Sequence, residues 1–592
     1  MIVPMKKATI IVQGKDAPAV MLDLRKLGLL HVEHHNLTQS KDVNILHEEL
    51  VLINNVLDIF SAAELTDMSY NRQKTTCHDW KFTAKHTIDL WKRYDQLGAY
   101  SENLNNQITE WERWGDFEPE KIQTLFQKGI FIRFYQVPVK QLNEFPADVV
   151  VKGIFIKDGL AHCAVVSRKN DNFPYKEIAL PKQSLSSMRQ RLAEDKNAML
   201  IIKDEIRKVY EFCDEFHDVK NNLVKEIEFR QAINGMGKSG SLVFVSGFVP
   251  GDSVDLLVEQ AKAKQWAYVI NDPKEEDSVP TLIRNPKWIS IINPVFKLLE
   301  IVPGYRELDI SLLFLIFFSL FFGILIGDAG YGLVYFIITF LIERRVKKTK
   351  KTSAQQFDFF LFYVLSFCAI IWGLLTGSFF GQAWLAKTGL KPLVPALNDT
   401  KNIQSFCFFI GALHLTLAHS WRAILKFPSL TALADIGWAF VLWAAFFFAK
   451  LLILSDVLPF YANWLLIIGI ILVVFFTNPQ KNILKTVGEG LGTLALSLMN
   501  NFTDVVSYVR LFAVGLAGVA IADTFNNMAA GVGTGNVIAI LASVFIIVAG
   551  HALNLVLGPM SVLVHGVRLN VLEFSGHASV TWSGFGYKPL KE

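Results

Sequence analysis

The chain has 592 residues, of which 52% are hydrophobic, and its formal net charge at pH 7 is only +4. This balance excludes a nucleic-acid-binding face built on a strong excess of basic residues. The charged residues are unevenly divided, because 80 of the 112 Asp, Glu, Lys and Arg residues lie before Gly304 and 32 from Gly304 onward. The division predicts a soluble N-terminal half joined to a membrane-embedded C-terminal half.

The N-terminus and the cysteines indicate a reduced, cytoplasmic N-terminal half without metal or cofactor. The first residues, MIVPMKKATIIVQG, alternate like a strand and are followed by Lys and Asp rather than by a cleavage site, so no signal peptide is expected. No CxxC pair or His/Cys spacing suggests zinc or a redox pair. The scattered cysteines are Cys77, Cys163, Cys213, Cys368 and Cys407.

Residues 1–300 are expected to form an α+β arm with two small αβ lobes linked by long antiparallel helices. The proximal lobe takes residues 1–36 and 240–285, the helical strut 43–114 and 183–232, and the distal lobe 117–182. At 1.5 Å per residue, a 50-residue helix would be about 75 Å long. That length suits a strut better than an enzyme core.

Two motifs in the arm imitate functional sites. AINGMGKS (232–239) differs from a phosphate loop by its first glycine, and it follows a helix and precedes a strand, the reverse of what a phosphate loop needs. HVEHH (31–35) has clustered histidines, but it ends an expected strand, where alternate side chains face opposite ways. We interpret the first as a glycine-rich helix exit and the second as a surface cluster.

Eight hydrophobic segments predict an all-α polytopic membrane domain over residues 301–592. They are residues 308–327, 329–344, 357–379, 402–420, 432–454, 462–477, 490–529 and 536–575. Basic runs follow the second, fourth and sixth segments, which puts these runs and both termini on the cytoplasmic side. The last two segments are about 40 residues long, so they must tilt, kink or project from the bilayer.

Polar residues recur at helical spacing along both long segments. Intervals of three and four residues place one set on a single face of the last segment. This set is His551, Asn554, Gly558, Ser561, His565, Arg568 and Leu572. The preceding segment carries Thr493, Ser497, Asn500, Asp504, Ser507 and Arg510, followed by small residues that allow another helix to approach closely.

Arg510 is the costly member of these two sets. An arginine at the centre of a membrane helix costs roughly 2.5 to 3.5 kcal/mol on insertion scales. Two simpler interpretations compete with an ion pathway: Ser, Thr and Asn side chains can join helices in a bundle, and Arg568 can extend to the cytoplasmic surface. Arg510 is about 20 residues from either end of its segment, too deep for such extension, which favours an ion pathway.

Two motifs carry these arginines, SYVRLFAVGLA (507–517) and LVHGVRLNVLEF (563–574). They resemble the membrane stator subunit of rotary V-type and archaeal-type ATPases, called subunit I in bacteria and subunit a in eukaryotes. The resemblance is specific in the membrane half and rests mainly on architecture in the arm. Shorter stretches that agree are SGFVP (246–250), PTLIRNP (280–286), PGYRELD (303–309), GDAGYG (327–332), GLLTGSFFG (373–381) and GALHL (411–415).

The resemblance implies a non-catalytic, multi-pass subunit of the cell membrane. Arg510, matching the family's essential arginine, would face a rotor ring of small subunits that each carry a mid-membrane carboxylate. A ring carboxylate meeting this fixed cation gives up H⁺ or Na⁺ to one aqueous half-channel, and the cation blocks a leak between half-channels. The arm would connect to peripheral stalk subunits, and the complex would include a central-stalk adaptor subunit.

The resemblance also assigns further ion-translocation residues. Arg568 matches the second arginine, and Ser561, His565 and Glu573 match polar positions near the cytoplasmic half-channel. Asp504 and Ser507, on the face that leads to Arg510, complete this group.

This chain departs from eukaryotic members at two relay positions, where a histidine and a glutamate are replaced by Gly518 and Gly558. Those two assignments cannot be carried over, so the choice between H⁺ and Na⁺ stays open.

The register of the last two segments predicts the neighbours of Arg510. Counting back from the turn near Val532, Arg510 lies at the depth of Asn554, and about 20 Å from Arg568 in simple antiparallel register. Only a kink, such as one at Gly558–Pro559, or a register shift would bring the arginines together. We therefore predict Asn554 and His551 as the nearer polar neighbours, serving the outer half-channel.

The alternative from a different class is a secondary transporter with an accessory cytoplasmic domain. It predicts inverted repeats and broken helices near a midplane site. No internal repeat is seen among the eight segments, and two double-length segments beside six ordinary ones disfavour it. A membrane-bound ATPase is disfavoured by the lack of a phosphate loop.

Overall fold

The structure, a computed structural model, describes residues 1–33, 41–62, 79–142, 144–146, 148–157, 159–170, 172–349, 356–381, 392–479, 483–533 and 535–591. His34 and His35 of the histidine cluster, and residues 63–78 of the expected strut, lie outside this range. The chain forms two compact units. The first comprises Met1–Thr9, Leu29–His31 and Gly247–Pro589, and the second Ile10–Gly28, Val32–Ser246 and Leu590–Glu592.

A five-stranded sheet joins strands from both ends of the arm sequence, in the order β2-β8-β1-β9 with β7 paired to β8. Helix α1 ends at Gly28, which takes a left-handed φ of 62° and donates its N–H to the Leu24 carbonyl. The elements are β1 (Met5–Gln13), α1 (Ala17–Leu27), β2 (His31–Glu33), β7 (Gly237–Ser239), β8 (Leu242–Pro250), α7 (Val254–Ala263) and β9 (Ala267–Asn271). Because β7 follows a helix, AINGMGKS lacks the strand-then-helix setting of a phosphate loop.

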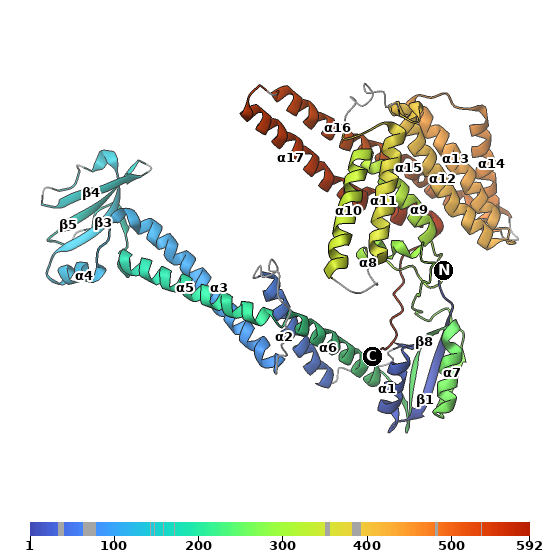
Figure 1. The fold of residues 1–592 in the computed structure, drawn as a ribbon, viewed down its shortest axis with the longest axis horizontal. Coiled ribbons are helices and arrows are strands. Elements are labelled where there is room, and N and C mark those ends of the chain that lie inside the picture. The colour runs from blue at the N-terminus through green and yellow to red at the C-terminus, as the bar shows by residue number, and fades with distance from the viewer. Residues whose placement is uncertain are drawn as a thin grey trace. The chain divides into compact units, whose positions relative to one another are not determined.

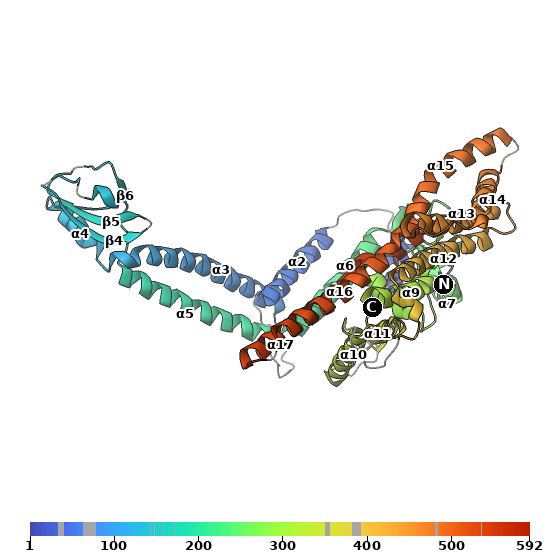
Figure 2. The ribbon, with the colours of Figure 1, turned by 90° about the horizontal axis from the view of Figure 1, so that it is seen from above.

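The second unit is dominated by long helices that carry a second sheet. Figure 1 and Figure 2 show α3 and α5 side by side, with β3, β4 and β5 at one end. The helices are α2 (Lys41–Ala62), α3 (Trp80–Trp111), α4 (Pro119–Gln127), α5 (Leu185–Tyr210) and α6 (Cys213–Asn234). The sheet, in the order β4-β5-β3-β6, contains β3 (Phe131–Pro138), β4 (Val150–Lys157), β5 (Leu160–Ser167) and β6 (Lys176–Ile178).

Caps set where the long helices of this unit begin. The Asp79 carboxylate accepts the N–H groups of Lys81 and Phe82 at the start of α3, and Ser184 accepts from Ser187 at the start of α5. One apolar face of each helix is buried against its neighbour, so α3 packs on α5 and α2 on α6.

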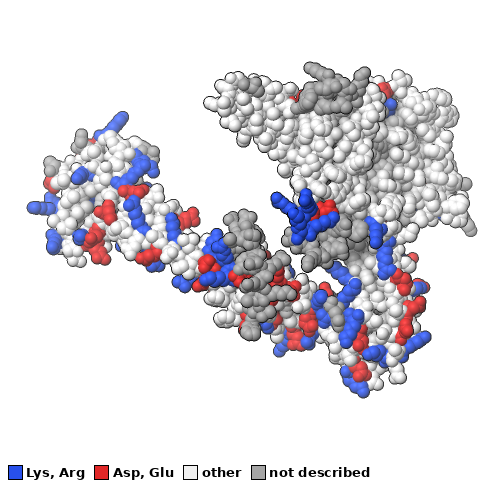
Figure 3. All heavy atoms as spheres, viewed as in Figure 1, with Lys and Arg blue, Asp and Glu red and all other residues white. Residues whose placement is uncertain are grey.

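The first unit contains the hydrophobic helices. These are α8 (Asn293–Leu298), α9 (Ser311–Ile326), α10 (Ala329–Thr349), α11 (Gln356–Thr376), α12 (Thr400–Lys426), α13 (Ala432–Ala449), α14 (Phe460–Phe476), α15 (Ile483–Ser507), α16 (Val509–Val532), α17 (Val537–Ser561) and α18 (Ser575–Ala578). On the face drawn in Figure 3, the surface of this helical region is almost free of charged side chains. Such a surface suits a hydrocarbon environment.

The described residues contain five helices long and apolar enough to cross a membrane. The number is six if α9 and α10, which are bent by 119° relative to each other, count as one broken span, and α14 is a shorter apolar helix. The eight spans expected from hydropathy therefore stay a prediction. The two long segments run as the continuous spans Ser497–Val532 and Val537–Ala578 but are not regular throughout. The seventh has one irregular turn at Tyr508, between α15 and α16, and the eighth contains π-helical turns at Val562–Gly566 and Leu569–Phe574.

Helix α9 lies at the centre of this unit, since it is apolar all round and buried on most sides. Glycines let other helices come close to it. At Gly515 of α16, an added Cβ would lie 2.5 Å from the Ile324 carbonyl oxygen of α9. The backbones of α9 and α16 are thus in direct contact one and a half turns beyond Arg510.

Candidate functional site

The seventh hydrophobic segment is interrupted at Tyr508, between α15 and α16. Tyr508 is fully buried, and its hydroxyl forms a 2.9 Å hydrogen bond with Nδ1 of His414 on α12. Gly411, also on α12, leaves room for the tyrosine ring, because a Cβ there would lie 2.7 Å from Cδ2. Tyr508 is thus held by α12, and Arg510 lies directly after this irregular turn within the long helix Ser497–Val532.

A single carboxylate lies near both arginines. Glu573 Oε1 is 4.0 Å from Nη1 of Arg510 and 3.6 Å from Nε of Arg568. The side chain of Glu573 is only 6% exposed, whereas those of Arg510 and Arg568 are 23% and 54% exposed. The Glu573 carboxylate therefore offsets part of the cost of holding the two guanidinium groups in this region.

The prediction that Asn554 and His551 are the nearer neighbours of Arg510 is therefore wrong. The simple register placed the turn at Val532, whereas the observed pairs Gly518–Asn554 and Asn526–His551 put both predicted neighbours opposite α16 residues that lie well beyond Arg510. Asn554 instead donates to the Gly518 carbonyl at 2.8 Å. His551 hydrogen-bonds to the hydroxyl of Tyr331 through Nδ1 and to Oδ1 of Asn526 through Nε2, at 2.6 and 3.1 Å.

The Arg510–Glu573 contact leaves hydrogen-bonding capacity unused. A separation of 4.0 Å is longer than a hydrogen bond. Nη1 of Arg510 and Oε2 of Glu573 are both buried and have no hydrogen-bond partner among the described residues. Two unit charges at this distance attract by about 4 kcal/mol at an effective dielectric constant near 20. The guanidinium is therefore held electrostatically while a donor remains for another acceptor.

Two of the cavities along the helices that carry the arginines contain residues predicted for the ion pathway. The polar cavity, of about 370 Å³, is lined by His419, Arg422, Trp438, Ser497, Asn500, Asn501, Asp504, Arg568, Leu572, Glu573, Gly576 and His577. The apolar cavity, of about 320 Å³, is lined by Leu325, Ile326, Tyr331, Tyr335, Ala513, Val514, Ala517, Gly518, Ile521, Asn554, Leu557, Gly558 and Ser561. They share no lining residue, and Arg510 falls in sequence between the two sets.

Of the remaining predicted residues, Asp504 and Ser561 line these cavities, whereas Ser507 and His565 line neither. Asp504 lines the polar cavity, and its Oδ2 is 3.1 Å from Nε2 of His577. Ser507 donates to the Asp504 carbonyl of its own helix at 2.7 Å. Ser561 lines the apolar cavity, and the half-buried His565 lies in the π-helical turn between the two sets of lining residues.

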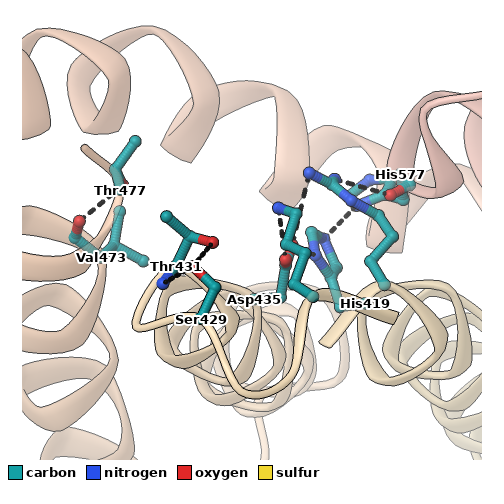
Figure 4. Close-up of polar contacts among 9 residues, drawn as sticks. His419, Ser429, Thr431, Asp435, Val473, Thr477 and His577 are labelled. Carbon is teal, nitrogen blue, oxygen red and sulfur yellow. Dashed lines mark hydrogen bonds and ion pairs between the residues drawn. The ribbon is translucent and has the colours of Figure 1, made fainter. Parts of the chain in front are cut away.

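A polar cluster on α12, α13 and α18 was not found from the sequence. Figure 4 shows His419 between Asp435 and His577. Arg422 and Lys426 also contact Asp435, at 3.4 and 2.7 Å. The spacing of three and four residues between His419, Arg422 and Lys426 puts them on one face of an otherwise apolar helix, a signal that could have revealed the cluster.

Comparisons with known proteins agree with the motifs. No family model matches the chain. V-type ATP synthase subunit I of Borreliella burgdorferi is 29% identical over 615 residues, and V-type ATP synthase subunit I 1 of Treponema pallidum is 29% identical over 626 residues, each match covering 100% of both chains. A-type ATP synthase subunit I of Methanocaldococcus jannaschii is 28% identical over 387 residues, which cover 58% of this chain and 54% of the relative.

A solved structure that aligns with the chain is the cytoplasmic N-terminal domain of subunit I, homolog of subunit a, of V-ATPase. The alignment covers 45% of this chain and 99% of the solved one, with 14% sequence identity and a TM-score of 0.24. The sequence matches extend across the arm, the interruption at Tyr508 and the helices that carry both arginines. The resemblance first stated on the motifs is confirmed, and the chain is a homologue of V-type and A-type ATP synthase subunit I.

Proposed function

We propose that the chain is the stator subunit of a rotary V-type ATPase or ATP synthase and that it forms two ion half-channels against a rotor ring. The observation that carries this proposal is the setting of Arg510, which falls in sequence between the residues that line two cavities with no common lining residue, and whose Nη1 has no hydrogen-bond partner in the described part of the chain. Such a cation can receive a carboxylate from another subunit while it separates two aqueous compartments.

The geometry suggests how Arg510 acts on a passing carboxylate. A ring carboxylate that arrives with a bound H⁺ or Na⁺ meets the guanidinium, releases the ion into one half-channel and moves on in ionised form. Glu573 keeps the guanidinium in place without forming a hydrogen bond to it, so no such bond has to break when the ring carboxylate arrives. An attraction of about 4 kcal/mol favours release of the ion without trapping the ring.

The surface of α16 and α17 supports a partner on this side of the molecule. The two helices lie together as a hairpin (Figure 1), and large apolar side chains of α17 are uncovered. Leu541, Phe545 and Val556 are 65%, 73% and 67% exposed. Together with the small residues that follow Arg510, this surface fits a ring of apolar helices surrounded by lipid.

The other parts of the proposal follow from the homologues. As a subunit I, the chain would not itself hydrolyse ATP, and its arm would anchor peripheral stalk subunits close to a central-stalk adaptor. Both termini would then lie in the cytoplasm. The polar cavity, with Arg568, Glu573 and Asp504, would be the cytoplasmic half-channel, and the apolar cavity, with Asn554 and Ser561, would belong to the outer one.

The alternative, a secondary transporter, predicts a broken helix near a substrate site, and α9 and α10 do meet at a break. The carboxylate at this break, Asp328, has both oxygens occupied by donors of its own chain. It therefore offers no free group to a substrate, which favours the stator over the transporter.

Replacement of Arg510 by alanine tests the proposal. In the purified complex reconstituted in vesicles, Arg510→Ala should reduce ATP-driven ion uptake to the level of vesicles without protein, while the complex still assembles. Arg189→Ala, which removes a surface arginine of the arm paired with Glu112, is the control and should retain full uptake. Full ion uptake by Arg510→Ala would refute the assigned role.

A further inference from the structure

We propose that Trp582, in the segment after α18, positions Glu573 beside the two arginines by holding the π-helical turn that carries this carboxylate. The inference rests on the proposed function and assigns a positioning residue to its ion pathway. Nε1 of Trp582 lies 3.0 Å from the Ser575 hydroxyl oxygen and 3.3 Å from the Val571 carbonyl oxygen. Val571 lies two residues before Glu573 and Ser575 two residues after it. The indole N–H therefore contacts the chain on both sides of the carboxylate.

The direction of the Glu573 side chain depends on the helix type of this turn. On an α-helix with 3.6 residues per turn, Arg568 and Glu573 would point about 140° apart. The turn Leu569–Phe574 is π-helical, and Glu573 Oε1 lies 3.6 Å from Nε of Arg568. A return of this turn to α-helical geometry would turn the carboxylate away from Arg568. Contacts that stabilise the π-helical turn therefore also set the position of Glu573.

Buried hydrogen bonds support the end of the π-helical turn. The Ser575 hydroxyl donates to the Asn570 carbonyl at 2.9 Å, and the Ser575 N–H donates to the same carbonyl, five residues back, as in a π-helix. Asn570 is fully buried and Ser575 is 1% exposed, so solvent does not compete for these bonds. The indole N–H of Trp582 extends this set to the Val571 carbonyl, the next one along the turn.

The Trp582 ring is held from the side opposite to the π-helical turn. It packs against Phe296 of α8, with ring centroids 5.8 Å apart, and Phe296 in turn contacts Phe314 of α9 at 4.9 Å. Two residues further on, the Gly584 N–H donates to the Val302 carbonyl at 3.1 Å. The indole is therefore fixed by the entry of α9, and its position does not depend on the helix that carries Glu573.

Two unusual backbone conformations bring Trp582 back to the π-helical turn. Ser579 and Trp582 have φ angles of 58° and 57°, in the left-handed region that residues other than glycine rarely adopt. Such conformations cost free energy and persist where the surrounding contacts hold them. The chain adopts two of them within four residues, and the reversal places the indole N–H on the turn. The contact is therefore a built feature of the fold.

The position of Glu573 matters because Arg510 has a long side chain that must be restrained. In the described part of the chain, Glu573 is the only carboxylate within 4.0 Å of the Arg510 guanidinium. Coulomb attraction falls with distance, so displacement of Glu573 weakens this restraint. The ring carboxylate would then meet the guanidinium less often in the productive position. Loss of the Trp582 N–H should therefore lower ion uptake although no charged group has been removed.

The test measures ATP-driven ion uptake by the purified complex in vesicles. Trp582→Phe keeps an aromatic ring against Phe296 but has no N–H donor. Uptake should fall about threefold to tenfold, the range for one lost hydrogen bond, while the complex still assembles. Trp288→Phe makes the same change at a tryptophan that is 57% exposed, and this control should retain full uptake. Equal uptake by the two variants would overturn the positioning role.

A double variant distinguishes the positioning of Glu573 from a general loss of structure. Glu573→Gln removes the charge that Trp582 positions. In the Glu573→Gln background, Trp582→Phe should therefore cause little further loss of uptake, because both changes act through the same group. If Trp582 were only structural, Trp582→Phe would lower uptake by the same factor in both backgrounds, and this result would overturn the proposal.

A further variant keeps the test decisive if Trp582→Phe does not assemble. Benzothienylalanine in place of Trp582 keeps the two-ring shape and has a sulfur atom where the indole has its N–H. It should assemble and show the same threefold to tenfold loss of uptake, the range for one lost hydrogen bond. Failure of both variants to assemble would overturn the proposal, because Trp582 would then stabilise the fold as a whole.

Arg510→Ala in the same vesicles separates the positioning role from the function on which it rests. Loss of uptake in Arg510→Ala together with full uptake in Trp582→Phe would reject the positioning role alone. Full uptake in Arg510→Ala would reject the stator role and the positioning role with it.

Discussion

Two irregular places in the membrane helices, the break between α9 and α10 and the turn at Tyr508, have charged side chains close by that are satisfied in opposite ways. At the break between α9 and α10, the carboxylate of Asp328 is fully buried. Its Oδ1 accepts the N–H groups of Gly330, Tyr331 and Phe380 at 2.7, 3.1 and 2.9 Å. Its Oδ2 accepts the Gly381 N–H and the Ser378 hydroxyl, both at 2.8 Å.

The charges beside the turn at Tyr508 are not fully hydrogen-bonded in this way. Glu573 and Arg510 face each other at 4.0 Å, and each keeps a buried polar atom without a hydrogen-bond partner in the described residues. Leaving such groups unpaired costs about 1 to 3 kcal/mol each. A buried carboxylate whose oxygens are all hydrogen-bonded within the subunit stabilises the fold. A charged group that keeps an unused donor or acceptor can instead bind a group of a partner subunit.

The comparison predicts different results when each carboxylate becomes an amide. Asp328→Asn puts an NH₂ group against at least one N–H donor, so we expect a loss of about 1 to 3 kcal/mol per unpaired group and little assembled subunit in the membrane. Glu573→Gln breaks no hydrogen bond of comparable length, so assembly should persist while ATP-driven ion uptake falls about tenfold, equivalent to about 1.4 kcal/mol. Immunoblots of membranes and uptake by vesicles measure the two effects, and equal assembly of both variants would contradict the distinction.

Helical spacing was enough to predict which residues share a face, but not which faces meet. The intervals along the last two segments identified Arg510, Arg568 and Asp504. The irregular turn at Tyr508 has neither Gly nor Pro beside it, and the Tyr508 hydroxyl is hydrogen-bonded to His414, 94 residues away. Conversely, Pro559, where a kink was considered, lies inside α17, which continues to Ser561.

Local counting also fails where the helix changes type. Arg568 and Glu573 are five residues apart, and side chains at this spacing point away from each other on an α-helix. In the π-helical turn Leu569–Phe574, which directly follows Arg568, the two side chains come together. His419 and His577 are separated by 158 residues, so no pattern within one segment could pair them. Tertiary contacts therefore decided the part of the site that the sequence could not predict.

Gly515 and Gly518, three residues apart on α16, allow the close contact between α9 and α16 to be tested with a matched control. Gly515→Ala would place a Cβ 2.5 Å from the Ile324 carbonyl oxygen, so α9 and α16 must separate at a cost of about 1 to 3 kcal/mol. At Gly518 the nearest atom, Oδ1 of Asn554, would be 3.6 Å from the new Cβ. Gly518→Ala should therefore be neutral or stabilise the helix by up to about 1 kcal/mol.

Thermal unfolding of the purified complex in detergent measures this difference. Gly515→Ala should lower the melting temperature of the subunit, and Gly518→Ala should leave it unchanged or raise it. Equal melting temperatures in the two variants would mean that the close contact between α9 and α16 at Gly515 does not stabilise the subunit.

Glu307 tests whether the fully bonded kind of carboxylate stabilises structure outside the membrane helices. It accepts the Gly304 N–H at 2.7 Å and the Thr581 N–H at 2.9 Å, and it also accepts the Thr581 hydroxyl, so it ties the segment after α18 to the entry of α9. Burial raises the pKa of Glu307, but the hydrogen bonds from Thr581 and Gly304 outweigh burial and hold the pKa below its usual range.

Because the pKa of Glu307 is lower in the folded protein than in the unfolded chain, the contribution of Glu307 to stability is complete above its unfolded pKa of about 4.3. It is lost as the pH falls through the folded value. Hydrogen exchange at the Thr581 amide should therefore speed up, relative to the intrinsic rate, below about pH 4. Glu307→Gln keeps an accepting oxygen but no titrating group. Protection of the Thr581 amide in this variant should therefore be weaker than in the unmodified protein at pH 7, and it should not change when the pH is lowered. If protection in the unmodified protein were the same at both pH values, Glu307 would hold Thr581 through geometry alone, and its charge would play no part in joining the two segments.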